Sequence, residues 1–114
     1  MSIEVVLTGK LKDPDGYREL GAEMCKVASD EEGTLRYDWL VSPEGAFRNV
    51  DVYADSAAFL EHFGAAQAAG YLERYMGLVE VERVDVSGDV SPEARAALSQ
   101  FGANFLDQVA SISA

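Results

Sequence analysis

The sequence predicts an α+β fold of the ferredoxin-like, split βαβ type, with helices on one face of an antiparallel sheet. Apolar patterns with strand and helix periods follow one another in the order strand, helix, strand, strand, helix, strand, and a further helical pattern ends the chain. The 114 residues suffice for one domain with its own core but not for two. We therefore expect a ferredoxin-like domain at residues 1–88 and a C-terminal helical extension of the same domain at residues 89–114.

The N-terminal part of the chain is predicted to form a strand and a helix. Apolar residues alternate with others from Ile3 to about Leu11, as in a strand with one buried face. Asp13 is a favoured N-cap residue, and Pro14 is tolerated at the first helical position. This helix should end near Ser29. Its buried face should carry Tyr17, Leu20, Met24, Val27 and Ala28.

Two strands joined by a turn follow, and here the local signals are strongest. Tyr37 and Trp39 belong to an alternating run that ends at Val41, before the chain reverses at Pro43-Glu44-Gly45. A second run, at residues 47–54, is rich in strand-forming residues. We therefore expect a hairpin between residues 34 and 54.

The charges of the hairpin favour one pairing register. A loop at residues 42–45 pairs Arg36 with Asp51, and no like charges then face each other directly. In this register Arg48 interrupts an otherwise apolar sheet face. A three-residue loop would shift the pairing by one residue. With the first register, the opposite face holds the apolar residues Leu40, Phe47 and Tyr53.

A second helical region and a fourth strand are predicted next. Asp55-Ser56 can cap a helix that carries His62, the only histidine. Glycines weaken the continuation of this helix, so we expect a break near Gly70 and a short second helical piece beyond it. Alternation at residues 78–86 predicts the fourth strand.

A terminal helix is predicted to begin at Ser91-Pro92-Glu93, which combines an N-cap residue, a first-turn proline and a first-turn acid. The expected helix carries an apolar stripe along one side. A stripe of this size must be buried, so we expect the helix to dock on its own subunit or on a partner. The stripe consists of Ala94, Leu98, Phe101, Phe105 and Val109.

Composition excludes several classes of partner. Twenty acidic and nine basic residues give a net charge of −11, which repels nucleic acid and anionic membrane surfaces. No apolar run reaches the roughly 20 residues that a membrane span needs. The first residues, MSIEVVL, lack the basic region of a secretory signal and are expected to form a strand, so we expect a cytoplasmic protein.

The sequence also predicts no metal site and no bound cofactor. The lone Cys25 cannot form an internal disulfide and is expected to be a small buried apolar residue. No cluster of cysteines and histidines has zinc-ligand spacing. Phosphate-loop, dinucleotide-binding and nucleophile motifs are absent from the sequence.

A homodimer is expected from the predicted sheet. Helices on one face leave the other face uncovered, and that face should hold the apolar residues Leu40, Phe47 and Tyr53. A second copy of the sheet would remove them from water.

Three segments resemble the antibiotic biosynthesis monooxygenase family, within the dimeric α+β barrel proteins. They are residues 32–37 (EGTLRY), 52–57 (VYADSA) and 59–62 (FLEH), and the resemblance extends over about residues 1–86. It implies a ferredoxin-like fold and a dimer formed by paired sheets. In several members it implies the oxidation of quinols or aromatic polyketides without a bound metal or flavin, whereas other members bind or degrade haem.

The resemblance assigns few individual residues. His62 matches the histidine common on the family's second helix, and Asp51 stands where an acidic residue, more usually Glu, precedes the aromatic residue of the third strand. The second histidine often found a few residues later is replaced by Gly64-Ala65-Ala66-Gln67, which weakens the case for haem. Trp39 and Asn49 are present but do not stand at matching motif positions.

The candidate catalytic residue is His62, because an imidazole with a pKa near neutrality can take a phenolic proton and activate an aromatic substrate toward oxygen. The alternative is a surface or hydrogen-bonded core histidine. Arg48 is a candidate to hold a substrate oxygen or carboxylate, or else it reaches solvent at the sheet edge. Aromatic side chains could also line a pocket, and the alternative is that they are ordinary core packing. They are Tyr37, Trp39, Phe59, Phe63, Tyr71 and Tyr75.

Two functions of different class follow. The first is a cofactor-independent monooxygenase that acts on a quinol-like or polycyclic aromatic compound. The second is a non-enzymatic dimer of the same fold that binds a small apolar ligand or serves as a scaffold. Haem binding or degradation is a third and weaker hypothesis.

Overall fold

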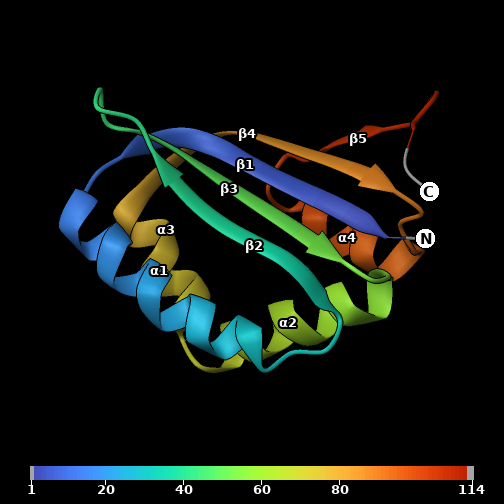
Figure 1. Cartoon of the computed structure of the whole chain (residues 1–114), viewed down its shortest axis with the longest axis horizontal. Coiled ribbons are helices and arrows are strands. Elements are labelled where there is room, and N and C mark those ends of the chain that lie inside the picture. Colours follow the sequence, from blue (N-terminus) through green and yellow to red (C-terminus); the bar gives the residue numbers. More distant parts are fainter. Residues whose placement is uncertain (1, 113–114) are drawn as a thin grey trace.

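One five-stranded mixed sheet is the framework of the computed structural model, which describes residues 2–112 (Figure 1). Its strands are β1 (Ile3–Leu11), β2 (Thr34–Val41), β3 (Ala46–Tyr53), β4 (Val79–Gly88) and β5 (Asn104–Leu106), in the order β2-β3-β1-β4-β5. The helices are α1 (Pro14–Ser29), α2 (Ser56–Ala68), α3 (Tyr71–Leu78) and α4 (Pro92–Ser99). The first four strands pair antiparallel, whereas β5 runs parallel to β4. The predicted ferredoxin-like α+β fold is confirmed.

The helices begin where the sequence predicts, because the expected side chains cap them. Asp13 accepts a hydrogen bond from the backbone N–H of the third residue after it (3.0 Å), and so do Asp55 (2.9 Å) and Ser91 (3.2 Å). The predicted break between α2 and α3 is confirmed at Gly70, whose φ of 80° lies in the left-handed region that favours glycine. Local capping and turn chemistry therefore set these boundaries.

The hairpin register predicted with the loop at residues 42–45 is wrong by one residue. The loop is Pro43-Glu44-Gly45, and the Ser42 N–H donates to the Ala46 carbonyl (2.9 Å). Gly45 has a φ of 86°, as a three-residue hairpin loop requires at its last position. Consequently the structure pairs Tyr37 with Asp51, Trp39 with Asn49, and Leu40 with Arg48.

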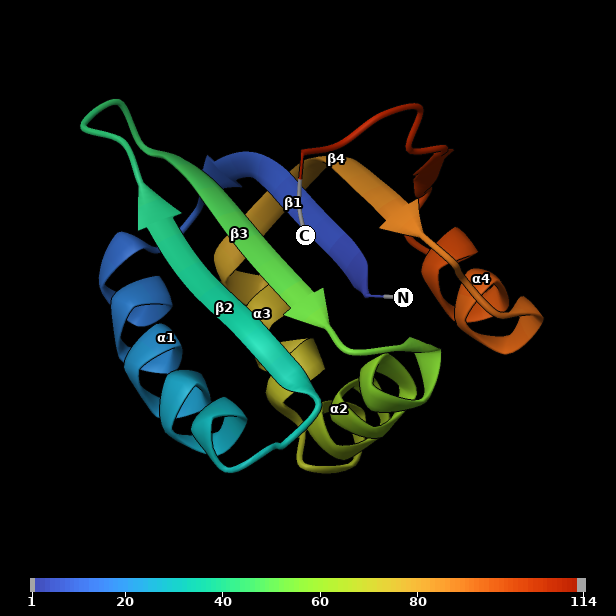
Figure 2. The same cartoon turned by 45° about the vertical axis from the view of Figure 1, so that its right-hand side comes forward.

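The shifted register changes which side chains lie beneath the helices. Figures 1 and 2 show the helices on a single face of the sheet. Phe47 and Tyr53 are buried there, so their predicted place on the uncovered face is wrong. Arg48 lies on the uncovered face and is exposed, and the prediction that it interrupts the face of Tyr37 and Trp39 is wrong too.

The main core joins the sheet to α2 and α4. Ile3 of β1 and Val84 and Val86 of β4 pack there against Phe59 of α2 and Leu98 of α4. A second, smaller cluster joins α1 to the sheet through Tyr17, Phe47 and Val79. The C-terminal segment thus docks on its own chain, as the apolar stripe predicted.

The length predicted for the terminal helix is wrong. Helix α4 ends at Ser99, Gly102 takes a φ of 71°, and β5 follows. Phe105 pairs with Val86 in the parallel ladder, and Val109 is 96% exposed. A glycine in the left-handed conformation ends the helical course of the backbone, so the stripe divides between a helix and a strand.

Two further observations concern Cys25 and the lengths of the helices. Cys25 is exposed on α1, with its Sγ 3.8 Å from the Tyr37 carbonyl oxygen, so its predicted burial is wrong. Among residues 2–112, none of the helices is long and apolar enough to cross a membrane.

Candidate functional site

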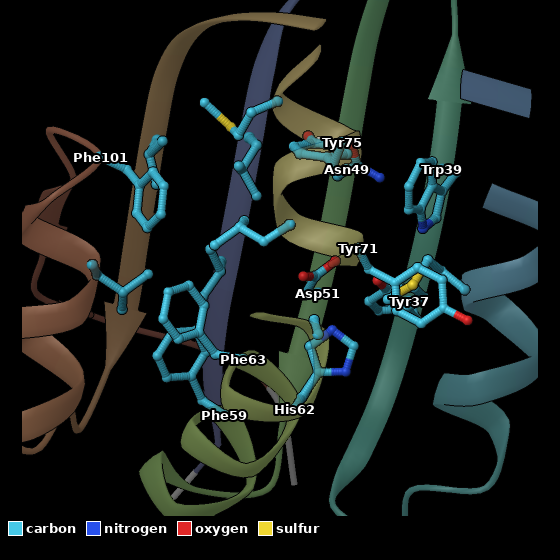
Figure 3. A pocket seen from close by; sticks show the side chains of 18 of the residues that line it. Tyr37, Trp39, Asn49, Asp51, Phe59, His62, Phe63, Tyr71, Tyr75 and Phe101 are labelled. Carbon is cyan, nitrogen blue, oxygen red and sulfur yellow. Dashed lines mark hydrogen bonds between the residues drawn. The ribbon is translucent and has the colours of Figure 1, made fainter. Parts of the chain in front are cut away.

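An aromatic pocket lies between the sheet and the helices (Figure 3). Strands β1 to β4 supply one wall. The four helices, together with the turn after α4, supply the remainder. Its lining is almost entirely apolar, as is usual for small-molecule sites. Prominent lining residues are Tyr37, Trp39, Phe59, His62, Phe63, Tyr71, Tyr75 and Phe101.

The size of the pocket limits what fits without movement. The cavity has a volume of about 110 Å³. An apolar cavity of roughly 150 Å³ accommodates benzene. The pocket as it stands therefore holds about one six-membered ring. A larger ligand requires lining side chains to move outward. Met76 of α3 is one of the lining residues and is 37% exposed.

Asp51 places a carboxyl group in the middle of this apolar lining (Figure 3). Its Oδ2 accepts a hydrogen bond from the Tyr53 hydroxyl (3.0 Å). Its Oδ1 is enclosed and has no hydrogen-bond partner among residues 2–112. Burial raises the pKa of Asp51 from 3.8 to about 7, opposed by the Tyr53 hydrogen bond and increased by the nearby charge of Asp38. Much of the Asp51 population therefore keeps its proton at neutral pH.

His62 lines both this pocket and an outer groove, whose acidic residues are Asp30, Glu31, Glu32, Asp55 and Glu61. It is 7% exposed, and its Nδ1 lies 2.6 Å from Oε1 of Glu31, in the connection between α1 and β2. The imidazole packs against the rings of Tyr37 (centroids 5.1 Å apart) and Tyr53 (5.6 Å). A carboxylate that accepts the Nδ1 proton fixes the ring orientation and leaves Nε2 as the basic nitrogen. Figure 3 shows the ring beside Asp51, with its second nitrogen turned toward the pocket.

Trp39 and Tyr37 form the wall contributed by β2. The Trp39 ring packs between Tyr17 (4.8 Å between centroids) and Tyr75 (5.6 Å), and a Cβ on Gly21 of α1 would come within 2.9 Å of it. Burial raises the pKa of Tyr37, although its contact with the Trp39 indole opposes this rise. That indole N–H is enclosed and, within residues 2–112, forms no hydrogen bond of good geometry. It is a second enclosed polar group of the residues that line the pocket.

Asn49 is a buried polar residue whose side-chain oxygen and nitrogen both form hydrogen bonds. Its Oδ1 accepts hydrogen bonds from the hydroxyls of Tyr17 (3.1 Å) and Tyr75 (2.8 Å), and its Nδ2 donates to the Asp38 carbonyl (3.4 Å). This network ties α1 and α3 to β3. Asn49 therefore holds the pocket walls in place.

Most of the predicted site residues come together in this pocket. His62, Tyr37, Trp39, Phe59 and Phe63 all line it. The exposed Arg48 does not, because the shifted register places it on the opposite face of the sheet.

Sequence reasoning missed the roles of Asp51 and Asn49. The family resemblance marks the position of Asp51 without giving it a role, and the alternative three-residue loop is the signal that turns both side chains toward the helices. Within residues 2–112 no three His, Cys, Asp or Glu side chains lie close enough together to hold a metal ion.

Comparison with known proteins then identifies the family. The family model for antibiotic biosynthesis monooxygenases matches residues 9–74. The chain belongs to this family. No curated protein matches the sequence.

Solved structures share the fold of this antibiotic biosynthesis monooxygenase family member. MupZ from Pseudomonas fluorescens superposes with a TM-score of 0.82 at 17% identity, over 99% of this chain and 94% of its own. SnoaB from Streptomyces nogalater, described as a cofactor-independent oxygenase, gives a TM-score of 0.66 at 14% identity, over 79% of this chain and 94% of its own. Rv0793 from Mycobacterium tuberculosis gives 0.64 at 23% identity, over 80% and 97%.

Proposed function

We propose that this protein is a cofactor-independent monooxygenase that oxidises a quinol-like or polycyclic aromatic small molecule. The observation that carries the proposal is the His62–Glu31 pair, which presents an imidazole to an aromatic pocket (2.6 Å between Nδ1 and Oε1). Family membership supports it, and so does the fold shared with SnoaB, a cofactor-independent oxygenase. The aromatic lining suits a flat aromatic ligand.

In the proposed reaction His62 acts as the general base. Nε2 takes the proton of a phenolic hydroxyl or of an activated ring carbon, and Glu31 stabilises the imidazolium that forms. The resulting electron-rich anion is the reductant of O2. One oxygen atom enters the substrate, so that a ring CH2 becomes C=O, and the other oxygen atom leaves as water with the two hydrogens.

Oxygen uptake with a panel of substituted hydroquinones and anthrones tests this function. We expect turnover with at least one compound, and His62→Ala should lower it at least about 10-fold because a positioned general base contributes at least that much. Gln67→Ala, a position on the same helix that does not line the pocket, is the matched control and should keep its rate. Uptake in the wild type no faster than in His62→Ala, across the whole panel, would refute the enzyme.

A ligand-binding protein without turnover is the second candidate, and the small apolar cavity favours it over a scaffold role. Trp39 lines the cavity and is the only tryptophan, so its fluorescence reports a bound ring. Saturable quenching by the same compounds, without oxygen uptake, would establish this alternative.

We also propose a homodimer formed by the sheet faces that carry no helix (Figure 2). Leu40 is 46% exposed on this face, and the strand registers place Val6 and Val52 on the same face. Phe47 and Tyr53 no longer contribute, because they are buried beneath the helices. Sedimentation equilibrium should give twice the monomer mass at micromolar concentration, and Leu40→Asp should shift the equilibrium toward monomer. A monomeric wild type would overturn the proposal.

A further inference from the structure

We propose that Asp51 is a second catalytic group of the pocket. It is a neutral carboxylic acid that gives its proton to the oxygen of a cyclic ketone. His62 meanwhile removes a proton from the conjugated carbon, which is the CH2 carbon whose anion is conjugated with that ketone. The predicted activity is keto–enol conversion of such ketones, and it needs no oxygen. The inference rests on the proposed function only in its use of His62 as a base. It adds an acid, a class of substrate and a reaction that can be observed alone.

The hydrogen bonds of Asp51 determine where its proton lies. Oδ2 already accepts from the Tyr53 hydroxyl (3.0 Å), so in the neutral acid the proton is best placed on Oδ1. That oxygen is enclosed and lacks a partner among residues 2–112. A buried polar group without a partner is unfavourable, and a ligand oxygen in the pocket would remove that cost. The unpaired Oδ1 is thus the oxygen from which the neutral acid of this pocket-lining residue can donate to a ligand.

The surroundings of Asp51 favour its neutral form. The titratable groups that line the pocket around it are Tyr37 of β2, Tyr53 of β3, His62 of α2, and Tyr71 and Tyr75 of α3. Tyr17 of α1 and Asp38 of β2 lie farther out and add no positive charge. No Lys or Arg side chain lines the pocket within residues 2–112. Apart from His62 when it is protonated, no positively charged side chain of this described part lines the pocket to compensate a carboxylate, to which the Tyr53 hydroxyl donates a hydrogen bond.

The acid and the base meet the same cavity from two elements. Asp51 projects from β3 and His62 from α2, and both line the pocket, where Figure 3 labels them. A carboxylic acid that an apolar site keeps neutral can donate a hydrogen bond to a ketone oxygen and stabilise the enolate. The pocket therefore combines a proton acceptor for carbon with a proton donor for oxygen.

The reaction is balanced without an oxidant. The C–H bond breaks, its proton moves to Nε2 of His62, and its electron pair forms the C=C bond of the enol. The carbonyl π pair moves to oxygen, which takes the proton of Asp51 Oδ1. The reverse transfers, to the same or another conjugated carbon, restore the ketone and both side chains. No net electrons are exchanged.

Deuterium exchange under strictly anaerobic conditions in D2O tests the proposal. The probes are 3-cyclohexenone, whose single ring matches the cavity, and anthrone, whose three rings require it to open. We expect protein-catalysed exchange at the conjugated carbon of at least one probe, at least about 10-fold slower in Asp51→Asn near pH 6. Asp85→Asn, which lies on β4 outside the pocket lining, is the matched control and should keep the wild-type rate.

The pH profile separates a catalytic role from a structural one. Because the protonated form is active, the wild-type rate should fall as the pH rises above about 7, in line with the raised pKa of Asp51. The amide introduced by Asp51→Asn cannot lose a proton, so this variant should lack the fall. Tyr53→Phe removes a hydrogen bond that lowers the pKa of Asp51, and should move the fall to higher pH.

The outcomes distinguish this inference from the proposed function. Exchange without oxygen uptake would support the acid–base pair and refute the monooxygenase. Oxygen uptake with equal rates and equal pH profiles in wild type and Asp51→Asn would refute the role of Asp51 and leave the monooxygenase standing. No exchange of either probe by the folded wild type would overturn the inference.

Discussion

Deletion of residues 89–114 should lower the melting temperature by at least about 10 °C. Leu98 is 3% exposed and Ala94 fully buried, both in the main core, while Phe101 packs on Phe63 with ring centroids 5.9 Å apart. Burial of one large apolar side chain stabilises a fold by about 1.5–3 kcal/mol. A change of 1 kcal/mol shifts the melting temperature of a domain of this size by about 4–8 °C. Thermal denaturation followed by circular dichroism measures the effect.

A milder variant keeps this prediction testable if the deletion does not fold. Leu98→Ala should lower the free energy of unfolding by about 2–5 kcal/mol, as large-to-small changes in a packed core do. Val109→Ala is the matched control, because Val109 is 96% exposed and should melt like the wild type. If Leu98→Ala also melted like the wild type, α4 would not be part of the domain.

The same segment also bears on the site. Leu98 and Phe101 line the pocket, so residues 89–114 close one of its ends. We therefore propose that residues 1–88 and 89–114 form a single domain. The shortened protein should lose ligand-induced quenching of Trp39 even at a temperature where it remains folded.

The elements were predictable because their signals are local. Asp13, Asp55 and Ser91 cap helices whichever fold surrounds them, and Gly70 interrupts a helix through its own backbone conformation. The end of α4 was not predictable in this way. The apolar stripe continues past Gly102, and only the pairing of Phe105 with β4 shows that the chain there is a strand.

The site was predicted only in part, because its polar residues depend on the length of the loop between β2 and β3. Tyr37, Trp39 and His62 carry type and spacing signals that do not depend on strand pairing. Whether Asp51 and Asn49 share a face with Tyr37 depends on the register of β2 and β3, and a one-residue change in loop length moves both to the other side of the sheet. Cross-strand charge complementarity favoured the wrong register. It does not decide the pairing, because its contribution of about 0.2–1 kcal/mol per pair is small beside burial of the apolar face.

Asp51→Asn should make the protein more stable than the wild type above pH 7 and leave the difference small near pH 4. Burial raises the pKa of Asp51 from 3.8 in the unfolded chain to about 7 in the folded protein. Between these values the unfolded chain has released the proton and the folded protein retains it, so the folded state binds more protons. The free energy of unfolding of the wild type therefore falls as the pH rises through this window.

The size of this effect follows from the same values. At 1.36 kcal/mol per pKa unit, a rise from 3.8 to about 7 weakens the fold by up to about 4 kcal/mol once the pH exceeds 7. The amide introduced by Asp51→Asn has no proton to lose, and any change in its hydrogen bonding is the same at every pH. Urea denaturation between pH 4 and pH 8 should show the two stability curves diverging. Asp85→Asn is the control, because the hydrogen bond from Arg83 lowers the pKa of Asp85 and does not raise it. Parallel curves for wild type and Asp51→Asn would mean that Asp51 is ionised in the folded protein at neutral pH.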